Sequence, residues 1–203
     1  MFEILTDNII NHFEGARRLY LTLHVFSVVL GMGAALISDY LFSAFASDFK
    51  INKFEHATFR KMSKLVWASL YAIVFSGIGV FLSDVAKYSH SDKFLTKMTV
   101  VFVIIINGYL MKRVLEPVLH KLKFDADFTF HKITLRKKAF ILGAISGASW
   151  LSAFVLAMLK NLPYTYFQML SVYGLVVLGA IIMAQIVEKV ISREAQKEKL
   201  LKL

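Results

Sequence analysis

The sequence contains no cysteine and only 2 prolines among its 203 residues. Without cysteine the chain has no disulfide, thiolate metal site, iron–sulfur cluster or covalently attached haem. Any redox reaction would therefore require a cofactor that binds without a covalent bond. The scarcity of proline suits long helices, since proline inside a helix removes a hydrogen bond and breaks or kinks the helix.

Charge is nearly absent from five long apolar runs, at about 19–45, 65–85, 98–116, 139–160 and 167–188. The whole chain is 57% hydrophobic, whereas soluble domains are about 45–50% apolar. About 20 apolar residues cross a bilayer as a helix, and backbone groups in lipid must be satisfied internally. The sequence therefore predicts an all-α, polytopic membrane protein, a bundle of five transmembrane helices forming a single membrane domain over residues 1–203.

The net charge of +10 comes from lysines and arginines that lie outside the apolar runs or at their ends. This distribution is typical of topology determination and not of nucleic-acid binding, which we exclude. Eighteen of the 24 basic residues fall on one side of the membrane and six on the other. This ratio predicts that the N-terminus is outside and the C-terminus cytoplasmic, with residues 189–203 as a charged helical tail. The expected location is a lipid bilayer, namely a bacterial inner membrane.

The first run carries a histidine on a face of small residues. His24, Ser27, Gly31, Ala35 and Ser38 are spaced by three or four residues, which places them on one side of a helix. Small residues at this spacing let another helix approach closely, so His24 is expected to face the bundle. The imidazole could form an interhelical hydrogen bond, or it could be a haem ligand, a metal ligand or a proton relay.

Asp39 lies 15 residues after His24, about 22 Å further along the helix axis, so the two side chains are not expected to touch. An ionisable group inside a span suggests a functional site. Two interpretations of Asp39 remain open. It could form a salt bridge with Arg60, Lys61 or Lys64, or it could bind a proton or a substrate.

Lys97 and Asn107 are the other polar candidates. Lys97 begins the third span at about the depth of His24. It could extend its ammonium group to the interface, or flank a cofactor or anionic substrate together with His24. Asn107 lies within a run of valine and isoleucine and is expected to hydrogen-bond between helices, as amides in spans commonly do.

Two segments resemble a known superfamily. Leu23-His24-Val25-Phe26-Ser27-Val28-Val29, followed by Gly33, is similar to the first-span pattern of the superfamily that contains the small bacterial membrane protoporphyrinogen oxidase and the copper-resistance D family. Lys97-Met98-Thr99-Val100-Val101 resembles a later span of the oxidase type. The resemblance implies that His24 and Lys97 bind a cofactor, haem b, with His24 as the metal ligand. The chain is also similar to uncharacterised five-span bacterial membrane proteins.

The leading functional hypothesis is thus a haem-associated membrane protein with a redox or tetrapyrrole-related role, such as a membrane oxidoreductase. His24 would be an axial ligand, and Lys97 a second ligand or the partner of a propionate. The alternative is a small transporter or ion-handling protein in which His24, Asp39 and Asn107 line a polar path. A third reading is a non-catalytic subunit or scaffold, because the small-residue faces favour a homo-oligomer or a larger membrane complex.

Overall fold

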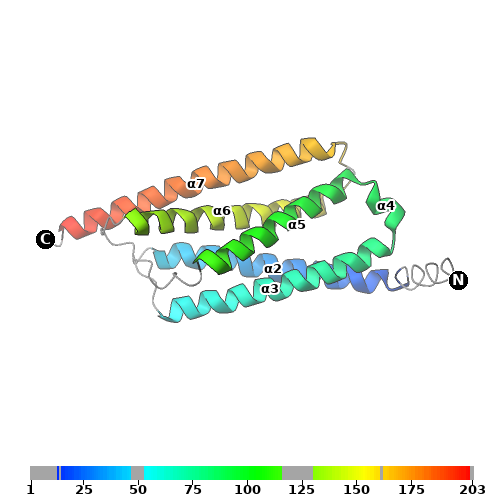
Figure 1. Ribbon diagram of the computed structural model, residues 1–203, viewed down its shortest axis with the longest axis horizontal. Helices are drawn as coiled ribbons and strands as arrows, with labels where there is room; N and C mark the ends of the chain where they lie inside the picture. Colours follow the sequence, from blue (N-terminus) through cyan, green and yellow to red (C-terminus); the bar gives the residue numbers. More distant parts are fainter. Residues whose placement is uncertain (1–12, 14, 47–52, 116–129, 161, 202–203) are drawn as a thin grey trace.

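A computed structural model describes residues 13, 15–46, 53–115, 130–160 and 162–201. Five long helices make up most of this part (Figure 1): α2 (Arg17–Ala46), α3 (Lys53–Leu82), α5 (Asp92–Leu110), α6 (Phe130–Met158) and α7 (Tyr166–Leu201). The short helix α4 (Val85–Ser89) connects α3 to α5, and the π-helical turn η1 (Met111–Leu115) continues α5. The described residues include no strand, and each long helix is long and apolar enough to cross a membrane. The predicted five-helix membrane fold is confirmed.

The helices extend beyond the predicted spans because charged turns continue the helix outside its apolar part. The structure begins α3 at Lys53 instead of residue 65, begins α6 at Phe130 instead of residue 139, and continues α7 to Leu201. Residue 116, where the third predicted span ends, lies outside the described part. The first turn of α2 and the last turn of α7 lie at opposite ends of the bundle (Figure 1). The orientation of these ends in the membrane stays a prediction.

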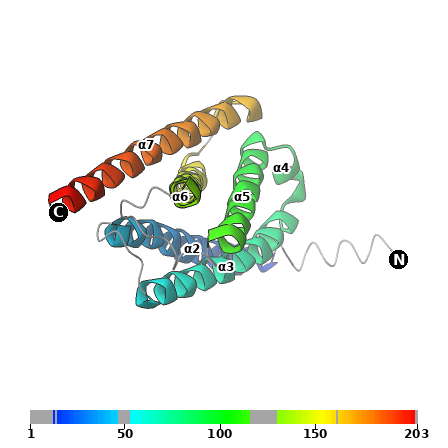
Figure 2. The same cartoon turned by 60° about the vertical axis from the view of Figure 1, so that its left-hand side comes forward.

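Helix α6 occupies the middle of the bundle, between α2, α5 and α7 (Figure 2). Its Trp150, only 2% exposed, is the largest side chain at the contact with α2. The predicted small-residue face of α2 makes this contact. A Cβ atom added to Gly31 would lie 2.6 Å from Trp150 Cη2 and 3.0 Å from Ser69 Cβ on α3. Helices α2, α3 and α6 can therefore meet at Gly31 because it has no side chain.

The described residues form two apolar clusters. The larger is in the middle of the bundle and joins all five long helices through Ala35, Leu70, Val100, Trp150 and Tyr173 with their neighbours. The smaller surrounds Phe140 near the start of α6, where the rings of Phe42 and Phe140 pack edge to face with centroids 5.3 Å apart. Packing in these clusters sets which residues of neighbouring helices lie at the same level along the bundle axis.

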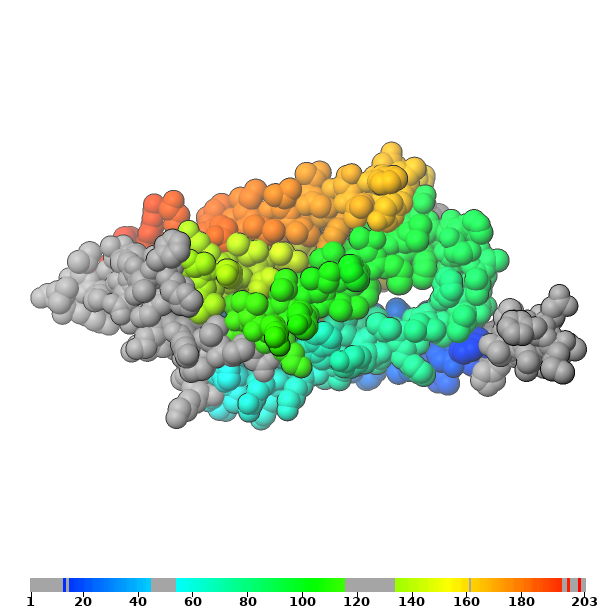
Figure 3. Space-filling view, viewed as in Figure 1, coloured from blue at the N-terminus to red at the C-terminus, as the bar shows by residue number. Residues whose placement is uncertain are grey.

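Helix α7 is the most exposed of the long helices. Only 6% of its apolar membrane window is buried, compared with 33% for α6. Figure 3 shows α7 along one edge of the molecule. A helix that is apolar around most of its circumference and exposed along its length is suited to contact with lipid.

Candidate functional site

His24 lies where α2 packs against α3. Its Nδ1 is 3.2 Å from the carbonyl oxygen of Ile73 and 3.2 Å from Ser76 Oγ. The ring lies beside Gly77, where an added Cβ would be 3.4 Å from His24 Cε1. The expectation that His24 faces the bundle is confirmed. On α3, the Ile73 carbonyl and Ser76 supply the acceptors, and Gly77 leaves space for the ring.

These contacts define the tautomer of His24. The Ile73 carbonyl can only accept, so Nδ1 carries the hydrogen and donates it. In the neutral ring Nε2 then holds the lone pair. Histidine ligands of metals commonly have this arrangement, in which the other ring nitrogen donates to a carbonyl. Hydrogen bonding to α3 therefore orients the ring and leaves one nitrogen as an acceptor or ligand.

Lys97 lies in the second turn of α5, and its charge acts on the His24 ring. The structure thus brings the ends of α2 and α5 that carry these two side chains into electrostatic range. For a haem, the groups present on these helices would be His24 Nε2 for the iron and Lys97 for a propionate. Neither of the two cavities described below is lined by His24 or Lys97. Within the described ranges no three His, Asp or Glu side chains form a group that could hold a metal ion.

Asp39 faces two glycines of α6. A Cβ added to Gly143 would lie 3.5 Å from Asp39 Oδ1, and one added to Gly147 would lie 3.2 Å from Oδ2. The carboxylate makes no hydrogen bond or ion pair with any described residue. The suggested salt bridge with Arg60, Lys61 or Lys64 is therefore wrong for the described chain, since these three side chains are exposed and Asp39 faces α6 instead.

A cavity of about 120 Å³ lies beside Asp39 and is lined by α2, α3, α5, η1 and α6. Three serines are among the residues that line it, namely Ser38, Ser63 and Ser146. The Ser38 hydroxyl donates to the carbonyl oxygen of Ala34 at 2.8 Å, while the Ser63 and Ser146 hydroxyls have no partner among the described residues. The cavity thus combines a free carboxylate with hydroxyl groups that can still form hydrogen bonds.

The opposite charge in this cavity comes from Lys112. Lys112 belongs to η1, and its Nζ lies 5.7 Å from the centroid of the Trp67 ring, which also lines the cavity. An ammonium group over an indole face is attracted by the ring quadrupole. Lys112 is exposed and forms no ion pair with Asp39, so an acidic and a basic residue that do not contact each other line one cavity.

Asn107 lies at the edge of this site. Its Nδ2 donates to the carbonyl oxygen of Leu142 on α6 at 2.9 Å, which confirms the expected hydrogen bond between helices. Ile104, Gly108 and Met111 line the cavity, whereas Asn107 does not. The Asn107 side chain is 4% exposed, and its Oδ1 has no hydrogen-bond partner in the described part. Among the residues proposed for a polar path, only Asp39 lines the cavity.

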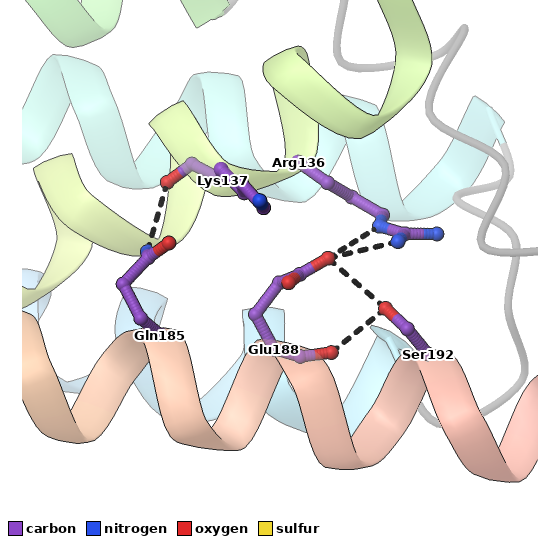
Figure 4. Close-up of polar contacts among 5 residues, drawn as sticks. All are labelled: Arg136, Lys137, Gln185, Glu188 and Ser192. Carbon is purple, nitrogen blue, oxygen red and sulfur yellow. Dashed lines mark hydrogen bonds and ion pairs between the residues drawn. The ribbon is translucent and has the colours of Figure 1, made fainter. Parts of the chain in front are cut away.

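A buried ion pair between α6 and α7 was not predicted from the sequence (Figure 4). Arg136 Nη2 lies 2.8 Å from Glu188 Oε1, and both side chains are less than 10% exposed. Ser192 Oγ also donates to Oε1 at 3.0 Å, and Gln185 Nε2 donates to the Lys137 carbonyl oxygen at 3.4 Å. One signal was available. A short connection makes α6 and α7 an antiparallel pair, so residues at similar distances from it, such as Arg136 and Glu188, come together.

Comparison of the chain with protein-family models, with curated proteins and with solved structures finds no match.

Proposed function

We propose that the protein binds a small zwitterionic solute in the cavity beside Asp39 and carries it across the membrane. The observation that supports this proposal is the pair of separated charges, Asp39 and Lys112, in one cavity between the helices. A solute with one ammonium and one carboxylate group would complement both charges. A solute with a single positive charge would bind near Asp39 but be repelled by Lys112.

The size of the cavity limits the solute. A water molecule occupies about 30 Å³ in the liquid, so about 120 Å³ corresponds to roughly four water molecules. A solute of similar size has few non-hydrogen atoms, comparable to a short amino acid. The Ser63 and Ser146 hydroxyls are available to hydrogen-bond its polar groups.

The state of Asp39 supports binding over a structural role. A carboxylate within a span is unfavourable by about 2.5–3.5 kcal/mol on insertion scales, and structural carboxylates recover this cost through partners. Glu188 has such partners in Arg136 and Ser192, whereas Asp39 has none in the described chain. A bound ammonium group would be the missing counter-ion.

The test uses three zwitterions with increasing charge separation, glycine, β-alanine and γ-aminobutyrate. Propylammonium and propionate are the singly charged controls. Purified protein is screened for a solute-induced rise in melting temperature, and proteoliposomes for uptake of the radiolabelled zwitterion. We expect at least one zwitterion to bind and be taken up, with both effects lost in Asp39→Asn and Lys112→Met.

Lys189→Met is the matched control, because Lys189 is an exposed lysine of α7 that does not line the cavity. The proposal is wrong if none of the three zwitterions binds, or if propylammonium binds as well as they do and Lys112→Met has no effect. Binding without uptake would contradict the transport part of the proposal and leave the site in place.

A haem-associated role is a second candidate, favoured by the free Nε2 of His24 and the nearby Lys97. When bound, haem would supply electron transfer, while the protein would orient His24 through Ile73 and Ser76. The test is the absorption spectrum of the purified protein with added haemin, before and after reduction. A Soret band that shifts on reduction and disappears in His24→Ala, but not in the exposed control His90→Ala, would support this candidate. The absence of haemin binding would exclude it.

A further inference from the structure

A second and larger cavity lies on an exposed side of the bundle, and none of the residues that line it lines the Asp39 cavity. It is an apolar groove of about 710 Å³ between the second half of α6 and the first half of α7. The groove side chains are largely exposed, with Val155 at 50% and Val172 at 61%. Tyr173 lines the groove, and its hydroxyl lies 2.8 Å from Ser149 Oγ, which joins the two helices on the buried side.

The length of the groove corresponds to one leaflet of a bilayer. It extends from Leu151 on α6 to Leu159, the residue after that helix, and on α7 from Phe167 to Val176. At 1.5 Å per residue these segments are about 12–14 Å long. Half of a hydrocarbon core about 30 Å thick is about 15 Å. The groove therefore runs from the connection between α6 and α7 to about the middle of the membrane. A partner helix would be expected to contact α7 along its full apolar length.

The rim of the groove at this connection is positively charged. Lys93 Nζ donates a hydrogen bond to the carbonyl oxygen of Leu159, which lines the groove, and the exposed Lys160 follows directly in the chain. Neither lysine forms an ion pair with a described residue, including Asp92 beside Lys93. The sequence has no acidic residue from Leu159 to Gln168. Two ammonium groups thus lie where lipid headgroups would be.

We propose that the groove binds one acyl chain of an anionic phospholipid from the leaflet that the connection between α6 and α7 faces. The lipid phosphate lies near Lys93 and Lys160, and the chain lies between α6 and α7. The apolar walls explain binding of a chain, and the charged rim explains the preference for an anionic headgroup. The exposed Tyr164 at the mouth of the groove is typical of the aromatic residues found at headgroup level.

The test uses the full-length protein in nanodiscs of equal parts phosphatidylcholine and phosphatidylglycerol. A trace of either lipid carries a photoreactive diazirine on its acyl chain, and labelled peptides are identified by mass spectrometry. We expect phosphatidylglycerol to label residues 151–176 more than phosphatidylcholine does. One lysine near a membrane surface changes the affinity for anionic lipid by about fivefold, so Lys160→Gln should reduce this preference by about that factor.

Control variants separate this site from general lipid contact. Lys189→Gln removes the same charge near the other end of α7 and should leave labelling of residues 151–176 unchanged, whereas Lys160→Arg should retain the preference. Val155→Trp fills the groove and should reduce its labelling by either lipid. Leu178→Trp, at a 57% exposed position of α7 outside the groove, should not.

Three results would overturn the proposal. The first is equal labelling of residues 151–176 by the two lipids in the unmodified protein. The second is the same preference in Lys160→Gln as in Lys189→Gln. The third is a photocrosslink from the groove to a second copy of the chain in place of lipid, which would identify the groove as a protein interface.

Discussion

His24 and Asp39 lie on the same helix, but only His24 has hydrogen-bond partners on the helix that it faces. His24 meets α3, where Ile73 and Ser76 accept from its ring nitrogen. Asp39 meets α6, where Gly143 and Gly147 offer space and no hydrogen-bonding side chain. The difference shows that the facing helix, and not α2 itself, determines whether a polar group in a span is satisfied. A satisfied group contributes to packing, whereas an unsatisfied one beside a cavity is available to a ligand.

The largest effect on stability is expected at the ion pair between α6 and α7. Its carboxylate, Glu188, has partners, in contrast to Asp39. Arg136→Met leaves Glu188 buried without its counter-ion and should lower the free energy of unfolding by about 3–5 kcal/mol. Replacing both residues, as Arg136→Met with Glu188→Leu, should recover most of this loss. Denaturant unfolding in detergent micelles measures both variants. A loss in the double variant as large as in Arg136→Met would show that packing, not charge, explains the effect.

Asp39→Asn should affect ligand binding more than stability. A hydrogen bond to a charged group contributes about 2 kcal/mol, so zwitterion affinity should fall roughly thirtyfold, as calorimetric titration would show. Stability should stay the same or increase, because the substitution removes a carboxylate that has no partner in the described chain. A large loss of stability without a loss of binding would make Asp39 a structural group like His24.

Gly147→Ala tests whether the space beside Asp39 matters. The added Cβ would lie 3.2 Å from Asp39 Oδ2, so the carboxylate or α6 must shift slightly. Overpacking of this kind costs about 1–3 kcal/mol, and we expect the lower end together with weaker zwitterion binding. Gly174→Ala on α7 is the matched control, since nothing lies within 4 Å of a Cβ there. Equal effects of the two substitutions would contradict a role for this space.

His24→Phe should have the smallest effect. It removes the hydrogen bond to α3, and such bonds within membranes contribute about 0.6–1.7 kcal/mol. Thermal unfolding should therefore shift modestly, while zwitterion binding at the Asp39 cavity stays unchanged. A loss of binding equal to that of Asp39→Asn would show that the two groups act together, and the contrast between them would be wrong.

Much of the fold could be predicted from the sequence, because an apolar run of sufficient length must form a helix in lipid. The inward face of His24 was also predictable, since helical spacing alone aligned it with Ser27 and Gly31. The helix ends were harder to predict. The helical segment from Lys53 to Lys64 is charged and therefore has no hydropathy signal. The neighbours of Asp39 were not predictable, since Gly143 and Gly147 are about a hundred residues away and only the packing of α6 brings them close.

The length of α7 has a mechanical consequence. Its 36 residues make a rod about 54 Å long, whereas a bilayer with its headgroups is about 40–45 Å thick. Roughly 10 Å of an upright α7 must therefore project into water, and tilting the helix shortens this projection. Glu188 lies 22 residues after Tyr166, about 33 Å along the axis, so its buried contact with Arg136 holds α7 against α6 before the projecting turns begin. The distance of a fluorophore at Leu201 from the membrane surface would therefore change with the tilt of α7.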